Sequence, residues 1–211
     1  MSLQAPATRI GLFGGSFDPV HNAHVALAEV AMAQLQLDSV RWIPAGNPWQ
    51  KPNQMAAAEH RAAMVTLAIA HEARFVLDRC ELHRDGPSYT LDTVRELKAA
   101  HPSAQFFLII GQDQYTSIHT WRGWQELLQV VTLAVAGRPG ASPEVNTEVH
   151  KQGHDAVALP MMAISSTEIR RRIASGQDIA DLVPAPVASY IARHSLYQGN
   201  QTLSQELNGH S

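Results

Sequence analysis

Cysteine and long apolar runs are scarce in this sequence, and each scarcity excludes a class of protein. Cys80 is the single cysteine among 211 residues, so the chain cannot form an internal disulfide and a reducing compartment is favoured. No apolar run approaches the ~20 residues that a membrane-spanning helix needs. The polar segment Met1–Thr8 also lacks the pattern of a secretory signal peptide. We therefore expect a cytoplasmic protein that does not contact a membrane.

The sequence also lacks an excess of positive charge. It contains 16 Lys and Arg against 19 Asp and Glu, for a net charge of −3. This balance argues against a protein that binds nucleic acid through a net positive charge. It is compatible with a protein that binds a small phosphorylated substrate through a few local cations. Hydrophobic residues make up 45% of the chain, which is enough for a packed core. A homo-oligomer is compatible with this composition.

Several catalytic motifs are missing as well. The eleven histidines are scattered, and Cys80 has no partner at zinc-ligand spacing, so we expect no metal site made by the protein alone. The sequence contains no G-x-S-x-G elbow and no Ser-His-Asp order. A G-x-x-x-x-G-K-[ST] loop is also absent, which excludes a P-loop nucleotide site.

Strand and helix patterns instead alternate along almost the whole chain, which predicts an α/β fold. We expect a Rossmann-like, doubly wound parallel sheet with helices on both faces. A single domain is expected to span residues 1–211, with flexible ends at 1–8 and 198–211. The segment 137–155 has no clear pattern. The expected strands are 9–13, 39–44, 75–78, 105–110, 130–136 and 156–159, and the main expected helices are 22–35, 57–71, 90–100, 165–175 and 186–193.

Such a sheet binds its ligand beyond the carboxyl ends of the strands, where the strand order reverses. The chain should therefore carry its functional residues just after Phe13, Pro44, Ile110 and Ala136.

The most informative stretch follows the first expected strand. Gly14 and Gly15 permit a sharp turn and let backbone N–H groups approach a ligand. Pro19 fixes the turn before the next helix. His21 and His24 then share one face of the first helical turn, at the end of a helix that attracts anions. This order predicts a phosphate-binding loop with two imidazoles directed into it. Taken alone, a Gly-Gly turn after a strand is common, and histidines at a helix start are usually solvated.

A second stretch, Ser165 to Arg170, has two interpretations. Ser165 and Glu168 have the spacing of a helix capping box, and the arginines could be ordinary surface charges. The same helix start could instead present hydroxyl and N–H groups to phosphates, with Arg170 one turn further on.

Isolated polar and aromatic residues near other expected strand ends also have two interpretations each. A carboxylate can cap a helix or bind a ligand, a tryptophan can fill the core or stack on a flat ring, and a cation can be merely solvated. The residues concerned are Asp113, Trp121, Lys51, Arg138 and the run Ser88-Tyr89-Thr90.

Two of these stretches together closely resemble the H-x-G-H nucleotidyltransferase superfamily. They are Gly14-Gly15-Ser16-Phe17-Asp18-Pro19-Val20-His21-x-x-His24 and Ile164-Ser165-Ser166-Thr167-x-x-Arg170. Within that superfamily the chain is similar to the bacterial nicotinate-mononucleotide adenylyltransferases, from about residue 9 to residue 197. The motifs that carry the narrower resemblance are Pro44-x-x-x-Pro48-x-x-Lys51, Ser88-Tyr89-Thr90, Ile110-Gly111-Gln112-Asp113, Thr120-Trp121, Ala136-Gly137-Arg138-Pro139-Gly140 and residues 181–191.

The resemblance implies transfer of AMP from ATP to nicotinate mononucleotide, with Mg²⁺ accompanying ATP. The products would be nicotinate adenine dinucleotide and pyrophosphate, as in NAD biosynthesis. It assigns the catalytic role to His21 and His24. It assigns ATP binding to Gly14, Gly15, Ser16, Phe17, Ser165, Ser166, Thr167 and Arg170. It assigns binding of nicotinate mononucleotide to Lys51, Thr90, Asp113, Trp121, Arg122 and Arg138.

Two departures from the family pattern bear on this interpretation. Ala23 replaces the glycine that precedes the second histidine, and Trp49-Gln50 replaces a common Pro-His pair. Two other functions are compatible with the residues. One is adenylyl or cytidylyl transfer to another phosphorylated acceptor such as phosphopantetheine, and the other is a nucleotide-binding regulatory module without catalysis.

Overall fold

A computed structural model gives the structure of the protein and describes residues 7–46, 55–137, 146–158 and 164–198. Lys51 and Arg138, two of the expected substrate-binding residues, lie outside these ranges. So do the Trp49-Gln50 pair and most of both expected flexible ends.

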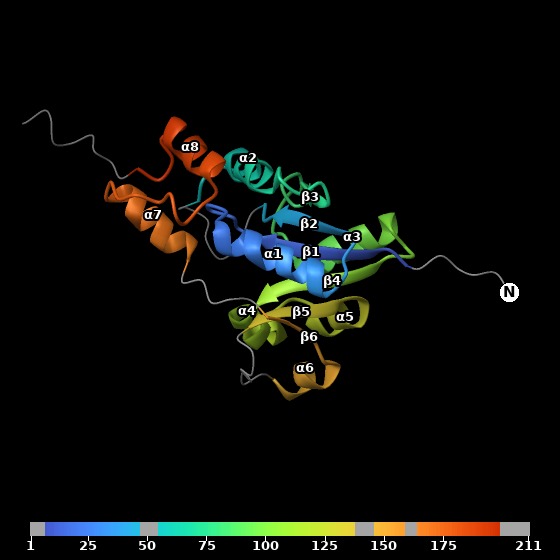
Figure 1. Cartoon of the computed structure of the whole chain (residues 1–211). Helices are drawn as coiled ribbons and strands as arrows, with labels where there is room; N and C mark the ends of the chain where they lie inside the picture. Colours follow the sequence, from blue (N-terminus) through green and yellow to red (C-terminus); the bar gives the residue numbers. More distant parts are fainter. Residues whose placement is uncertain (1–6, 47–54, 138–145, 159–163, 199–211) are drawn as a thin grey trace, which may run out of the picture.

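A single six-stranded sheet forms the centre of the described structure, in the order β3-β2-β1-β4-β5-β6 (Figure 1). Every neighbouring pair is parallel, as expected for a chain in which strands and helices alternate. The order reverses between β1 and β4, which makes this the switch point of the sheet. The strands are β1 (Arg9–Gly15), β2 (Ser39–Pro44), β3 (Phe75–Leu77), β4 (Gln105–Gly111), β5 (Thr132–Gly137) and β6 (Asp155–Ala158).

Helices cover both faces of the sheet, as the alternation predicts (Figure 1). Those on one face are α1 (Asn22–Gln34), α2 (Ala58–Ile69), α7 (Ser166–Ala174) and α8 (Ala185–Arg193). Those on the other are α3 (Thr90–Ala100), α4 (Gln112–Ser117), the short 3₁₀ helix η1 (Ile118–Thr120), α5 (Trp124–Val130) and α6 (Thr147–Gln152).

Two apolar clusters, one on each face, hold these layers together. Phe13 and Trp42 point into the cluster beneath α1, whereas their chain neighbours Leu12 and Ile43 point into the cluster beneath α3. This alternation is the two-residue period of a strand buried on both faces.

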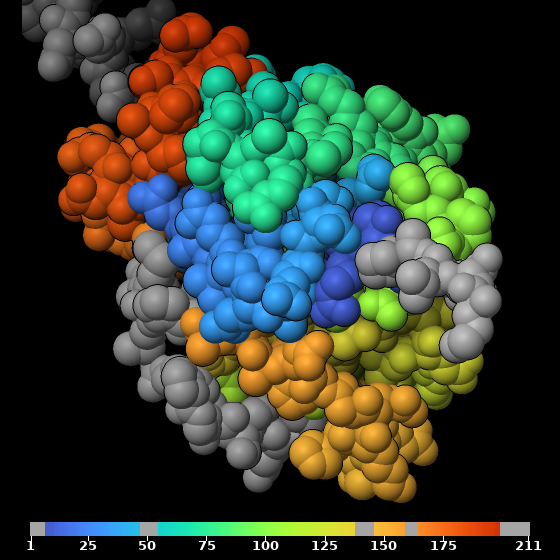
Figure 2. Space-filling view, turned by 45° about the vertical axis from the view of Figure 1, so that its right-hand side comes forward, coloured from blue at the N-terminus to red at the C-terminus, as the bar shows by residue number. Residues whose placement is uncertain are grey.

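The last two helices return to the beginning of the chain. α7 and α8 lie beside the start of α1 in both views (Figure 1, Figure 2). The backbone N–H of Asn22 donates to the carbonyl oxygen of Leu182 at 2.9 Å. Residues from the two ends of the described chain are therefore brought to one edge of the sheet.

The expected start of one strand was wrong, and the segment without a clear pattern contains a helix. The expected strand at 130–136 begins later, because Val130 ends α5 and Val131 caps that helix. The unassigned segment contains α6, whose Asn146 side chain caps the helix by accepting from the N–H of Glu148 at 2.9 Å. Among the described residues, no helix is long and apolar enough to cross a membrane.

Candidate active site

A cavity of about 670 Å³ opens at the carboxyl edge of the sheet, beside the switch point between β1 and β4. Its wall combines the end of β1, the end of β4 and the start of α3, which is where an open α/β sheet binds its ligand. The expected site residues in this wall are Gly14, Gly15, Ser16, Thr90, Trp121 and Arg122.

The loop after β1 turns at a different residue from the one expected. Gly14 and Gly15 are the last two residues of the strand, and the turn follows them. Phe17 has a φ of 47°, in the left-handed region that side chains seldom occupy, and its ring is 1% exposed. Gly14 serves a different purpose, since a Cβ built on it meets no atom within 4 Å. The space beside Gly14 is therefore open to a ligand.

His21 and His24 are stacked at the start of α1, with ring centroids 3.6 Å apart and planes 25° apart. His21 is the N-cap residue, and His24 is the third residue of the helix. The ring of Phe17 meets the His24 ring edge-on at a centroid distance of 5.2 Å. The buried Phe17 side chain thus supports the histidine pair.

Hydrogen bonding assigns the proton of the neutral His24 ring. The backbone N–H of His21 donates to Nδ1 of His24 at 3.2 Å, so Nε2 of His24 carries the hydrogen. The neutral His24 ring is therefore a donor through Nε2. Nδ1 of His21 is buried and has no hydrogen-bond partner among the described residues.

Both histidines are neutral near pH 7 in this structure. Burial lowers the pKa of His21 to about 4. Burial and the adjacent His21 hold the pKa of His24 well below its ordinary value. Two neutral rings do not repel each other electrostatically. A bound anion would raise the pKa of either ring and so favour its protonated form.

The helix α7 faces the loop after β1. The Ser165 hydroxyl accepts from the N–H of Glu168 at 3.2 Å, so this serine caps the helix. The Ser166 hydroxyl donates to the carbonyl oxygen of Pro19 at 3.0 Å. Arg170 donates from Nη1 to the carbonyl oxygen of Asp18 at 2.6 Å. The capping interpretation is confirmed for Ser165, whereas Ser166 and Arg170 contact the backbone of the loop after β1 and their binding of phosphate stays a prediction.

The start of α3 forms the other side of the cavity. Thr90 is the first residue of α3 after Tyr89, the N-cap residue, and helix starts carry N–H groups without intrahelical acceptors. The guanidinium of Arg122 lies over the Tyr89 ring at 4.5 Å from its centroid. Trp121 is half-buried in the same wall. A flat ring and a carboxylate could both be accommodated here.

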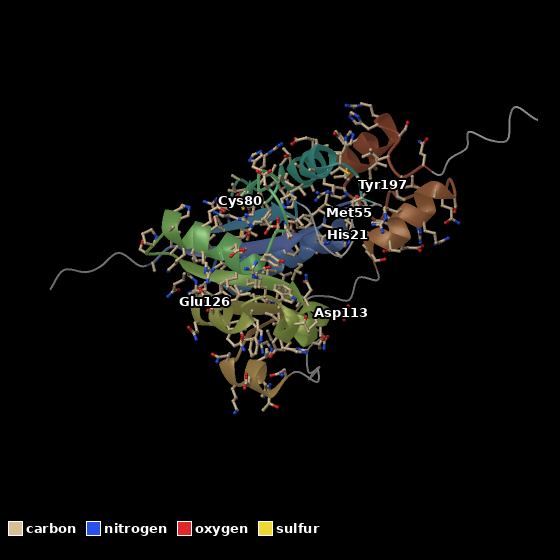
Figure 3. All side chains as sticks on the ribbon, turned by 180° about the vertical axis from the view of Figure 1, so that it is seen from behind. His21, Met55, Cys80, Asp113, Glu126 and Tyr197 are labelled. Atoms are coloured by element: carbon tan, nitrogen blue, oxygen red, sulfur yellow. The ribbon has the colours of Figure 1, made fainter. Side chains whose placement is uncertain are left out.

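Other expected residues lie outside the cavity wall. Asp113 is exposed on α4, at the same edge of the sheet as His21 (Figure 3). The histidine pair and the α7 residues also lie beyond the wall, next to the loop rather than within the cavity. Ala23 is the second residue of α1 and is partly exposed.

The wall also contains residues that sequence reasoning missed. Glu81 is largely buried, accepts from the Thr93 hydroxyl at 2.8 Å, and has a pKa raised chiefly by burial. The Ser88 hydroxyl is buried without a partner within the described ranges. Ser88 belongs to the recognised Ser-Tyr-Thr run, but no local pattern distinguishes Glu81 from an ordinary loop carboxylate.

The chain matches a protein-family model and several curated proteins over most of its length. A model of the cytidylyltransferase-like family matches residues 12–172. The chain is 52% identical to a probable nicotinate-nucleotide adenylyltransferase of Methylibium petroleiphilum, over 92% of this chain and 94% of that one. It is 47% identical to a protein of the same name from Albidiferax ferrireducens, over 90% and 98% of the two chains.

Solved structures show the same fold. Plasmodium falciparum nicotinic acid mononucleotide adenylyltransferase complexed with NaAD has a TM-score of 0.75 at 22% identity, covering 90% of this chain and 97% of that one. The same enzyme complexed with APC has a TM-score of 0.73 at 21% identity, with equal coverage.

Proposed function

Because the chain belongs to the nicotinate-nucleotide adenylyltransferases of the cytidylyltransferase-like family, we propose that it transfers AMP from ATP to nicotinate mononucleotide. The observation that carries this proposal is the stacked pair His21 and His24 at the start of α1, next to the loop that borders a cavity lined by Thr90 and Trp121. The reaction would supply nicotinate adenine dinucleotide to NAD biosynthesis in the cytoplasm.

The chemistry fits this pair of histidines without a strong base. A phosphate oxygen of nicotinate mononucleotide attacks the α-phosphorus of ATP, a new P–O bond forms, and the bond to the β-phosphate breaks. Pyrophosphate leaves with that electron pair. The nucleophile is already anionic, so the protein has to position the groups and stabilise the charge on the transferring phosphate. The Nε2–H of His24 is a suitable donor for this purpose.

Each substrate has a separate half of the site in this proposal. ATP lies against Gly14, Gly15 and the backbone of Ser16 and Phe17, with Ser165, Ser166, Thr167 and Arg170 closing from α7. The nicotinate ring stacks on Trp121, and its carboxylate meets Arg122 and the first N–H groups of α3 at Thr90. Asp113, Lys51 and Arg138 are proposed on the mononucleotide side.

The donor set suits a magnesium ion carried by ATP rather than one held by the protein. Among the described residues, no three His, Cys, Asp or Glu side chains gather closely enough to hold a metal ion. Mg²⁺ keeps several waters and favours phosphate oxygens, so its ligands would come mainly from the nucleotide. Bound there, it would neutralise phosphate charge.

A panel of acceptors tests the function. The purified protein is incubated with ATP and Mg²⁺ together with nicotinate mononucleotide, its amide analogue or phosphopantetheine, and pyrophosphate release is measured. We expect a clear preference for nicotinate mononucleotide. Preference for phosphopantetheine would instead identify another nucleotidyltransferase. ATP binding without pyrophosphate release for any acceptor would indicate a regulatory module.

Removal of either imidazole tests the assigned catalytic role. We expect His21→Ala and His24→Ala each to lower kcat by roughly 10²–10³, the cost of removing one donor to a transition-state oxyanion. The measurement is steady-state pyrophosphate release by variants whose circular dichroism matches that of the wild type. Activity close to that of the wild type in both variants would remove these roles.

A further inference from the structure

Asp18 is a buried carboxylate inside the proposed phosphate loop. Its side chain is 1% exposed, although it lies between Phe17 and His21 on the chain. One carboxylate oxygen, Oδ1, accepts from the Tyr197 hydroxyl at 2.7 Å and from the backbone N–H of Ala56 at 3.0 Å. A carboxylate so deeply buried needs such partners, because desolvation of an unpaired charge is costly.

The same residue meets α7 on its other side. Nη1 of Arg170 lies 3.5 Å from Oδ2 of Asp18 and donates to the carbonyl oxygen of that residue at 2.6 Å. Asp18 therefore contacts three segments that are far apart in the sequence: the chain before α2, the helix α7 and the segment after α8.

Tyr197 reaches Asp18 because the chain turns back after α8. Ser195 and Tyr197 have φ values of 49° and 62°, both in the left-handed region. Backbone of this kind in residues other than glycine persists only where surrounding contacts hold it. Burial and the neighbouring Asp18 raise the pKa of the Tyr197 hydroxyl, so it is a hydrogen-bond donor at any physiological pH. Figure 3 shows Tyr197 at the same end of the molecule as His21 and Met55.

Arg61 also holds the loop after β1 through hydrogen bonds. Its guanidinium is buried and donates to the carbonyl oxygens of Ser16 at 2.9 Å, Ala56 at 3.1 Å and Gly46 at 3.3 Å. The negative Asp18 thus lies among the cations Arg61 and Arg170 and the hydroxyl of Tyr197. These contacts converge on the backbone of residues 16–19, directly before the histidine pair.

We propose that Asp18 and Tyr197 are positioning residues for ATP. The Tyr197 hydroxyl fixes the Asp18 carboxylate, and Asp18 in turn sets the path of the phosphate loop and the place of Arg170. This inference rests on the proposed function, since it takes ATP to be the ligand of the loop. Neither residue needs to touch the nucleotide, and the loss of either should weaken ATP binding more than binding of the acceptor.

The test begins with Tyr197→Phe, which removes one hydroxyl and leaves the ring in place. The matched control is Tyr190→Phe, because the Tyr190 hydroxyl pairs with Nδ1 of His60 at 3.0 Å, between α2 and α8. Calorimetry gives the Kd for ATP, kinetics give KM for each substrate, and a thermal melt gives Tm. We expect Tyr197→Phe to raise Kd and KM for ATP about tenfold, the effect of one hydrogen bond to a charged group. KM for the acceptor should not change, and the control should leave both KM values unchanged.

A second variant tests the same contact from the side of the carboxylate, with Tm measured alongside the Kd for ATP. Asp18→Asn keeps the size of the side chain and an oxygen that can accept from Tyr197, but it removes the charge facing Arg170. We expect weaker ATP binding here also. The Kd for ATP of the Asp18→Asn, Tyr197→Phe double variant should rise by less than the product of the two single-variant increases. Both substitutions act through the Asp18 side chain, so their effects are not independent.

The outcomes separate this inference from the proposed function. If the wild type makes dinucleotide and Tyr197→Phe lowers Tm without changing the Kd for ATP, the contact is only structural and the inference is wrong. If the wild type binds ATP but transfers nothing to nicotinate mononucleotide, the proposed function fails, while the Kd values of the variants still decide the inference. If the wild type binds no ATP, both are wrong.

Discussion

Burial of the His21 ring makes the unfolding free energy of the protein depend on pH. With a pKa of about 4 in the folded protein and about 6.5 in an unfolded chain, His21 takes up its proton more readily when the chain is unfolded. The unfolding free energy should therefore be fully retained above about pH 6.5 and fall as the pH drops toward 4. His24, whose pKa is also lowered, adds to this loss.

The corresponding prediction concerns His21→Gln. Between about pH 6.5 and 4, this variant should lose less unfolding free energy than the wild type, by up to about 3 kcal/mol. Urea denaturation at a series of pH values measures the difference. The control is substitution of the exposed His150 by Gln, which should follow the wild type. Parallel curves for all three proteins would contradict the burial of His21 as the cause.

Gly14 gives a second prediction at this scale. Since a Cβ on this residue meets no protein atom within 4 Å, Gly14→Ala should leave the unfolding free energy within about 0.5 kcal/mol of the wild type. If ATP lies against this backbone, the added methyl should weaken ATP binding about tenfold. Calorimetry and urea denaturation on the same preparation separate the two effects. Unchanged ATP affinity would place the nucleotide elsewhere.

The residue scale also shows what the sequence could not predict. The two glycines suggested where the chain turns, but the left-handed residue is Phe17, whose ring is held by Phe13, Trp42 and His24. Tertiary packing overrides the local preference at this position. Likewise Asp18 and Tyr197 are separated by 179 residues, so no local pattern could pair them.

Among the secondary-structure elements, α7 offers a comparison between neighbouring arginines. Arg170 reaches the loop after β1, whereas Arg171 is exposed and pairs with Glu168 at 2.7 Å. We expect Arg170→Ala to raise KM for ATP about tenfold or more, because charge-assisted contacts to phosphate are strong. Arg171→Ala should not change it. Equal effects of the two variants in steady-state kinetics would mean that α7 acts only through its net charge.

Elements with strong periodicity and clear end signals were predicted well. The bounds of β2 and α3 are as expected, because Pro44 ends an apolar strand and Thr90 follows a polar loop. The start of β5 was wrong, since Val130 and Val131 favour a strand locally, but Val130 is the exposed last residue of α5 and Val131 is the buried residue that caps it. The short helix α6 was missed because six residues carry too little periodicity to be recognised.

For the whole molecule, the proposed substrates should act as stabilisers. A ligand that binds only the folded chain at about 100 times its Kd adds ~2.7 kcal/mol, which corresponds to a rise of about 5–10 °C in Tm for a domain of this size. We expect such a rise with ATP and Mg²⁺, and a further rise when nicotinate mononucleotide is added. A thermal melt measures both. An unchanged Tm at saturating ATP would contradict an ATP site on the folded chain.

The overall architecture followed from the sequence because alternating strand and helix patterns allow few arrangements of a parallel sheet. The place of the cavity followed as well, since the switch point lies where β1 and β4 meet. The convergence of α7 and the segment after α8 on the loop after β1 did not, because it depends on how the helices pack.

The contact between Tyr197 and Asp18 also has a consequence for the growing chain. A ribosome adds about 5–20 residues per second, so roughly 10–40 s separate the synthesis of these two residues. Until Tyr197 emerges, Asp18 lacks its hydroxyl partner, and the loop before His21 has its contacts to Arg61, Ser166 and Arg170 but not this one. If Asp18 and Tyr197 position ATP as proposed, a chain that has not yet reached Tyr197 should bind ATP about tenfold more weakly than the finished protein.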